Sequence, residues 1–189
     1  IEGNNKLTPN APIKLVWLNN QNIKFEKEIS VDNQYLFTVK QTIINNSEKT
    51  YNFYPYGQII RNEIPEITNF FILHEGPIGV FDSELAEEDY DNIQEKPFSV
   101  NADRGWLGIT DKYWIASIIP QENRKFRADF DYKNKFRTNF IESNATEIGA
   151  NETKSNEIKI LLAAKEVRII DEYAKKLNIE KLDLVIDWG

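Results

Sequence analysis

The feature that most constrains this fold is an apolar stretch in the middle of an otherwise polar chain. Residues 105–120 read GWLGITDKYWIASIIP, with β-branched and aromatic residues on both sides of Thr110-Asp111-Lys112. Turn-forming residues between two such runs are the usual signal of a β-hairpin. We therefore expect a hairpin with strands near 107–109 and 113–119, ended by Pro120, which has no N–H for a further ladder bond.

The aromatic residues of this hairpin predict its place in the molecule. Trp106, Tyr113 and Trp114 fall within nine residues. Each ring carries a large apolar area, and removing such area from water is worth about 25 cal/mol per Å². The hairpin is therefore predicted to lie in the middle of a hydrophobic core, with Trp106 and Trp114 both buried.

Most of the remaining chain follows the two-residue alternation of half-buried strands. Two segments differ: an acidic run at 84–90, capped by Ser83, is expected to form one or two helical turns, and 143–153 is expected to be a polar loop. The pattern predicts a mainly antiparallel β fold with further strands near 13–18, 23–29, 35–44, 50–54, 70–73, 77–81, 125–132, 135–142 and 156–164.

After Ala164 the apolar period changes from two to between three and four residues. This spacing predicts one amphipathic helix from Lys165 to Leu177, with Asn178 just beyond its C-terminus. Its apolar face is expected to pack on the sheets and its polar face to stay in solvent. The expected apolar residues are Val167, Ile170, Tyr173 and Leu177, and the expected exposed ones are Arg168, Glu172 and Lys176.

Composition excludes several classes of function. The net charge of −7 argues against binding nucleic acid or anionic lipid by charge, because both require basic patches. The chain has no cysteine, which removes disulfides and thiolate chemistry. No apolar run approaches the roughly 20 residues of a membrane-spanning helix, and no signal peptide is present. We therefore expect a water-exposed segment of 189 residues that is large enough for a substantial core.

The sequence offers little to support catalysis. His74 is the only histidine, so any imidazole chemistry would depend on it alone. Its neighbour Glu75 would point to the opposite face of a strand, and the acidic residues of 84–91 lack the spacing of a calcium loop. No phosphate loop, nucleophile elbow or zinc-binding helix is found. We therefore expect no catalytic, cofactor-binding or metal-binding residues.

Three stretches resemble one protein family, in the same order and at similar spacing. The first is the GWLGITDKYW run at 105–114, and the second is Glu75-Gly76-Pro77-Ile78-Gly79. The third extends from Ala164 through Tyr173 and Leu177 to residues 182–189, LDLVIDWG. Together they resemble the large periplasmic domain of YidC-type membrane protein insertases and its passage into the second membrane span.

The resemblance implies a fold and a place in the cell. The fold would be an antiparallel β-supersandwich of two packed sheets over residues 1–164, followed by a helical segment over 165–189. The parent protein would be a multi-pass protein whose domain faces the periplasm at the bacterial inner membrane, with both flanking spans outside this chain. The family's domain commonly begins with further strands, so this chain is expected to lack part of one sheet, with either an incomplete sandwich or an unpaired edge as the result.

The resemblance also implies a function without catalysis. The domain would assist the insertion of new membrane proteins, with nascent chains and the Sec translocon as partners. Related folds in sugar epimerases work with histidines that this chain lacks. The expected membrane-proximal or interaction residues are Lys165, Glu166, Arg168, Glu172, Lys176, Asp183, Asp187 and Trp188. A sandwich that binds a carbohydrate or another small ligand in an aromatic cleft remains the alternative.

Overall fold

The computed structural model describes residues 1–3, 5–64 and 74–186. Its strands are β1 (Ile13–Leu18), β2 (Ile23–Val31), β3 (Leu36–Asn45), β4 (Tyr51–Phe53), β5 (Tyr56–Arg61), β6 (Gly76–Phe81), β7 (Glu84–Glu87), β8 (Phe98–Ala102), β9 (Gly105–Thr110), β10 (Trp114–Ile119), β11 (Phe126–Tyr132), β12 (Phe136–Glu142), β13 (Thr146–Ile148) and β14 (Thr153–Ala164). Its helices are α1 (Tyr90–Glu95), α2 (Val167–Lys176) and the 3₁₀ helix η1 (Leu182–Val185).

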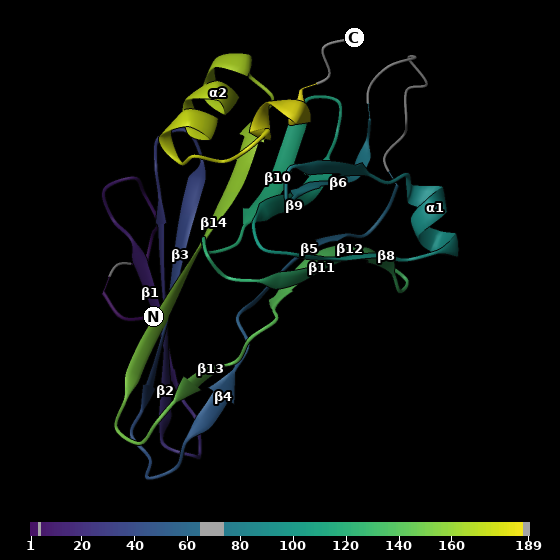
Figure 1. The fold of residues 1–189 in the computed structure, drawn as a ribbon. Coiled ribbons are helices and arrows are strands. Elements are labelled where there is room, and N and C mark those ends of the chain that lie inside the picture. The colour runs from purple at the N-terminus through teal and green to yellow at the C-terminus, as the bar shows by residue number, and fades with distance from the viewer. Residues whose placement is uncertain (4, 65–73, 187–189) are drawn as a thin grey trace.

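Two antiparallel sheets dominate the structure, which confirms the predicted fold class (Figure 1). The larger has eight strands in the order β1-β2-β3-β14-β10-β9-β6-β7, and the smaller has four in the order β5-β12-β11-β8. Strands β4 and β13 form a separate two-stranded arm. Within the described part of the chain, strands hold about half of the residues.

The smaller sheet packs against one end of the larger sheet. We call the apolar contact between them the first core. Phe98 stacks on Phe130 with ring centroids 5.0 Å apart, and Phe81 stacks on Phe98 at 6.0 Å. The larger sheet contributes Phe81, Leu107, Ile109 and Ile118, and the smaller contributes Phe126, Phe130, Phe136 and Phe140.

The predicted hairpin forms at the centre of the larger sheet as β9 and β10. Ile115 pairs with Thr110 and Ile118 with Leu107, and the N–H of Asp111 donates to the carbonyl of Trp114 across the turn at 2.9 Å. Gly108 is required here, because a Cβ at this position would lie 2.3 Å from the carbonyl oxygen of Ala116. The hairpin prediction is therefore confirmed, including its turn.

The prediction that both tryptophans are buried is wrong for one of them. Trp106 is fully buried, whereas Trp114 is 61% exposed. Neighbouring residues of a strand point to opposite faces. Ile115 points into the core beneath α2, so the side chain of Trp114 must point to the other face, which the smaller sheet does not cover at this end. The alternation of side chains along β10 therefore leaves this indole exposed, although indoles are generally buried.

Other predictions fail in the less regular parts of the chain. The acidic run expected to be helical is strand β7 at 84–87, and helix α1 begins only at Tyr90. The loop expected at 143–153 contains β13, which pairs with β4. Strands β5 and β8 were not predicted, and the strand expected at 70–73 lies outside the described residues.

Candidate functional site at the C-terminal helical segment

Helix α2 follows β14 after a sharp change of direction at residues 165–166. The carbonyl of Glu166 accepts the N–H of Ile170 at 3.0 Å and so begins the helix. At the other end Asn178 is left-handed, with φ of 51°. The N–H of Ile179 donates to the carbonyl of Ala174, which is the Schellman arrangement that ends helices. The predicted helix and its C-terminal Asn are confirmed.

One face of α2 covers the end of the larger sheet and forms what we call the second core. Ile170 and Tyr173 on the helix are buried there together with Trp106 of β9. Each of these residues is at most 2% exposed. The other buried members are Leu36, Ile78, Val80, Ile115, Leu161, Ala163, Ile179, Leu182 and Val185.

The exposed face of α2 carries the charged residues that the sequence predicted. Arg168 and Glu172 form an ion pair one turn apart at 3.3 Å, with side chains 83% and 54% exposed. Lys176 is also exposed, in the last turn, where a cation is favourable for the helix dipole. Val167 was expected to pack on the sheets but is 42% exposed, because it occupies the first helical position, beyond the reach of the second core.

A partly buried hydrogen bond ties α2 to the turn between β2 and β3. The hydroxyl of Tyr173 donates to the Asp32 carboxylate, at 2.8 Å from Oδ1 and 2.7 Å from Oδ2. The backbone N–H groups of Gln34 and Leu36 donate to the same carboxylate. Burial opposes ionisation, but these hydrogen bonds outweigh it and hold the pKa of Asp32 below its usual value. Burial and the Asp32 carboxylate together raise the pKa of Tyr173.

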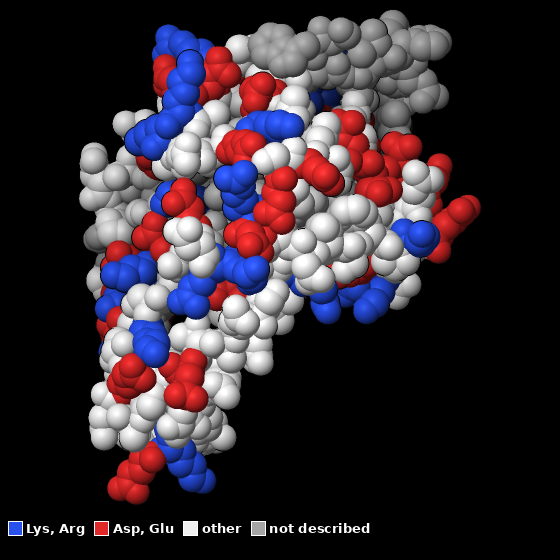
Figure 2. Space-filling view, viewed as in Figure 1, with Lys and Arg blue, Asp and Glu red and all other residues white. Residues whose placement is uncertain are grey.

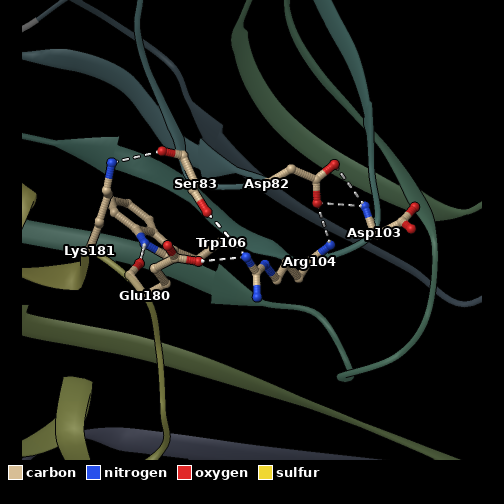
Figure 3. A network of polar contacts seen from close by, with 7 residues as sticks. All are labelled: Asp82, Ser83, Asp103, Arg104, Trp106, Glu180 and Lys181. Carbon is tan, nitrogen blue, oxygen red and sulfur yellow. Dashed lines mark hydrogen bonds and ion pairs between the residues drawn. The ribbon is translucent and has the colours of Figure 1, made fainter.

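The segment between α2 and η1 is held by side chains of the hairpin strand β9 and its preceding turn (Figure 3). The indole Nε1–H of Trp106 donates to the carbonyl of Glu180 at 3.1 Å. The Arg104 guanidinium lies 3.4 Å from the Glu180 carboxylate. The buried tryptophan that the sequence singled out therefore also positions the C-terminal segment.

The same network continues into the turn between β6 and β7. Arg104 donates to the Ser83 hydroxyl at 3.2 Å, and the ammonium group of Lys181 donates to the Ser83 carbonyl at 2.8 Å. Asp82 accepts the backbone N–H groups of Asp103 and Arg104, which fixes the two turns against each other (Figure 3). Two turns of the larger sheet and the C-terminal segment thus meet at one place.

The remaining predicted site residues are spread along the segment. Lys165 is half-buried, and its Nζ lies 3.1 Å from the Thr110 hydroxyl. Glu166 is exposed at the helix N-terminus, and Asp183 is half-buried in η1. The structure therefore does not bring these residues together into one cluster. Asp187 and Trp188 lie outside the described residues.

Sequence reasoning missed the residues that dock the segment. Asp32, Ser83 and Arg104 stand 141, 98 and 76 positions before their C-terminal partners Tyr173, Lys181 and Glu180, and no local pattern links them. The prediction of Ser83 as a helix cap is wrong, because Asp82 and Ser83 have φ of 49° and 74° and form a tight turn. The one signal in the sequence for this turn is the pair of turn-forming residues Asp82-Ser83 between two strands.

A second candidate site is a groove of about 570 Å³ between the larger sheet and the β4–β13 arm. We call it the aromatic groove. Trp17 stacks on Phe25 with centroids 5.1 Å apart, and Phe25 meets the edge of Phe53 at 5.8 Å. Trp17 is 62% exposed. The other lining residues include Leu15, Ile43, Tyr54, Tyr56, Ile148 and Asn156.

Charges beside the aromatic groove are paired with each other. Glu26 lies 2.7 Å from both Lys14 and Lys24, and these hydrogen bonds hold its pKa below the usual value. At the inner end Asn156 donates to the Glu142 carboxylate at 3.3 Å. Burial raises the pKa of Glu142 despite the nearby Arg124. Lysines and acids are likewise interspersed over the face seen in Figure 2.

The described part of the chain offers few side chains for imidazole chemistry or metal binding. His74 lies just before β6, and its imidazole contacts the carbonyl of Pro77, within that strand, at 3.0 Å. Residues 1–3, 5–64 and 74–186 contain no group of three or more histidines and acids placed to hold a metal ion. Over the same residues, no helix is both long and apolar enough to cross a bilayer.

Comparison with known proteins assigns the chain to a family. The model of the YidC periplasmic domain matches residues 2–189. A membrane protein insertase YidC of Pelagibacter ubique is 57% identical over the whole chain, and that of Rickettsia prowazekii is 40% identical over 97% of it. The chain spans 34% of the length of each of these relatives.

Solved structures share the fold at low identity. A galactose mutarotase related enzyme from Lactobacillus acidophilus matches 80% of this chain and 67% of its own, with a TM-score of 0.55 and 10% identity. A protein from Synechocystis matches 84% of this chain and 63% of its own, with a TM-score of 0.54 and 8% identity. These similarities support the sandwich architecture alone, whereas the sequence matches show that the chain belongs to the family of YidC periplasmic domains.

Proposed function

We propose that this chain is the non-enzymatic periplasmic part of a membrane protein insertase and that its C-terminal helical segment, residues 165–189, couples the sandwich to the following membrane span. The observation that carries the proposal is the way this segment is docked. Apolar packing beneath α2 and directional hydrogen bonds from Tyr173 and Trp106 hold it in one orientation on the larger sheet. A segment fixed in this way transmits the orientation of the domain to whatever follows it.

The exposed face of α2 is the proposed contact surface. Arg168, Glu172 and Lys176 project into solvent from a helix whose other face is buried. The proposed partners, implied by family membership and resemblance, are nascent membrane proteins and components of the Sec translocon. The proposed setting is the periplasmic face of the bacterial inner membrane.

Complementation of an insertase-depleted strain tests this proposal. Arg168, Glu172 and Lys176 are changed together to Ala in the full-length protein. A matched control changes Glu122, Lys133 and Lys135 to Ala. These residues are exposed, and their substitution also removes two positive charges and one negative charge, but away from α2. We expect poor growth from the α2 variant and normal growth from the control. Equal growth at equal expression would refute the role of this face.

Site-specific crosslinking tests the partners. A photoreactive amino acid is placed at position 172 on α2 and, as the control, at position 135 in the turn between β11 and β12. We expect adducts with a Sec component or a stalled nascent chain from position 172 and not from position 135. The same weak adducts from both positions would count against α2 as the contact surface.

The aromatic groove supports a second candidate function, the binding of a carbohydrate or another small apolar ligand. Stacked rings such as Trp17 and Phe25 suit the faces of sugars and apolar groups. Titration with monosaccharides and oligosaccharides, followed by calorimetry, tests this function. Binding should disappear in Trp17→Ala and persist in Trp114→Ala, because Trp17 lines the groove whereas the equally exposed Trp114 does not.

A further inference from the structure

The exposed residues of the central hairpin call for an explanation. Tyr113 is 64% exposed and Trp114 61%, although they belong to the most apolar stretch of the chain. Lys112 stands over the Tyr113 ring at 5.1 Å. Large aromatic side chains exposed together commonly mark an interaction surface.

Neighbouring strands add further apolar side chains at the same end of the larger sheet. Trp114 lies opposite Ala164, and the N–H of Leu162 donates to the carbonyl of Tyr35 at 3.2 Å. Leu162 is 44% exposed and Tyr35 64%. Helix α2 starts beside them with the exposed Val167. We call these residues the aromatic rim: Tyr35, Tyr113, Trp114, Leu162 and Val167.

Trp114 and Leu162 of the rim continue a buried face of the larger sheet, whereas Val167 joins them from the start of α2, which packs on the other face. Further along the same strands Val39, Ile118 and Ile158 belong to the first core. There the four-stranded sheet covers them, and beyond its edge the same face reaches solvent. The protein itself supplies no cover for the rim within the described residues.

We propose that the aromatic rim rests in the membrane–water interface of a lipid bilayer. Indole and phenol rings favour this interface, because one edge is apolar and the other can bond to headgroups and water. Lys112 places a cation beside Tyr113 at headgroup level. With a net charge of −7, the chain is not drawn to the bilayer by charge, so ring insertion supplies the attraction.

The position of the rim favours a bilayer over a protein partner. Helix α2 and η1, the last described element, lie at one end of the molecule (Figure 1). The rim belongs to this end, because Trp114 pairs with Ala164 where β14 leads into α2. The relatives that the chain matches are named membrane protein insertases, and the chain spans 34% of their length. The proposal rests on the proposed function, because both place the membrane beside the C-terminal segment.

Lipid quenching of tryptophan fluorescence tests the proposal. The 189-residue chain, carrying Trp188→Phe and a C-terminal polyhistidine tag, is held on phosphatidylcholine vesicles that contain a nickel-chelating lipid. Replacing the phosphatidylcholine with its brominated form quenches indoles that enter the interface. Two further variants, Trp114→Phe and Trp17→Phe, each remove one exposed indole. Trp17 is 62% exposed but pairs with Phe25 near the opposite end of the larger sheet.

We expect bromine-dependent quenching that is lost in Trp114→Phe, is retained in Trp17→Phe and is unchanged in 0.5 M salt. No quenching, or equal quenching in both variants, would overturn the lipid assignment and leave a protein as the occupant of the rim. Loss of quenching in salt would overturn ring insertion. The tag holds the C-terminus at the vesicle surface whatever the function of the α2 face. The quenching result is therefore independent of the complementation result with the α2 variant.

Discussion

The two cores of this protein are closed in different ways. The first core, between the sheets, is packed with phenylalanine rings such as Phe81, Phe98 and Phe130. The second core, beneath α2, has polar bonds at its margin, made by the side chains of Tyr173, Trp106 and Arg104. Apolar packing is non-directional, whereas hydrogen bonds fix angles. The first core therefore holds the sheets together, and the second holds the C-terminal segment in one orientation.

The largest expected effect separates the two tryptophans of the central hairpin. Trp106→Ala should lower the free energy of unfolding by about 3 to 5 kcal/mol, because it opens a cavity in the second core. Trp114→Ala should change it by less than about 0.5 kcal/mol, because the side chain is exposed. Chemical denaturation measures both. Similar losses from the two variants would contradict the difference in burial between them.

The next prediction asks whether the second core can open alone. Ile170→Ala should cost about 2 to 5 kcal/mol of local stability, because Ile170 is fully buried between α2 and the larger sheet. Hydrogen exchange should then rise in 167–176 while β11 and β12 stay protected. Phe130→Ala is the matched change in the first core and should raise exchange throughout the sheets. Uniform exchange in both variants would mean that the cores unfold as one unit.

The sequence predicted those parts of the fold that a local pattern encodes. Alternation located the central hairpin, and the change of period at Ala164 located α2 with its C-terminal Asn178. The sequence wrongly predicted that Trp114 is buried, because whether a face of the larger sheet is covered depends on how far the smaller sheet extends. That extent is a tertiary property.

The candidate site was predictable only in part, for a similar reason. The exposed charges of α2 follow from the helical period. The contacts of Asp32 with Tyr173 and of Arg104 with Glu180 join residues 141 and 76 positions apart. A single sequence carries no pairing signal over such separations, so the polar margin of the second core became visible only in the fold.

A smaller effect is expected from the partly buried hydrogen bond between Tyr173 and Asp32 at this margin. Asp32→Asn should cost about 1.5 to 3 kcal/mol at pH 7, the usual range for hydrogen bonds to a charged group. Because the folded state lowers the pKa of Asp32, its contribution is complete above the unfolded value of about 3.9 and is lost as the pH falls through the folded value. The difference between the wild type and Asp32→Asn should therefore shrink below about pH 4.

Tyr173→Phe provides the control for this bond, because it keeps the ring and removes only the hydroxyl donor. Denaturation curves of the two single variants and the double variant, measured at pH 7 and pH 3, give the coupling between the residues. Additive losses at pH 7 would contradict a direct Asp32–Tyr173 bond. A difference that grows on acidification would contradict the direction assigned to the pKa of Asp32.

The smallest expected effect concerns the exposed part of the margin. Arg104→Ala should lower the free energy of unfolding by only about 0.2 to 1 kcal/mol, because ion pairs in contact with solvent are weak. The side chains of Arg104 and Glu180 are 68% and 41% exposed. Arg168→Ala removes an exposed pair within α2 and is the matched control. Only Arg104→Ala should speed hydrogen exchange at 180–182, because Arg104 contacts Glu180 and the β6–β7 turn, whereas Arg168 pairs only within α2. A loss as large as that of Ile170→Ala would mean that polar contacts, rather than the second core, dock the segment.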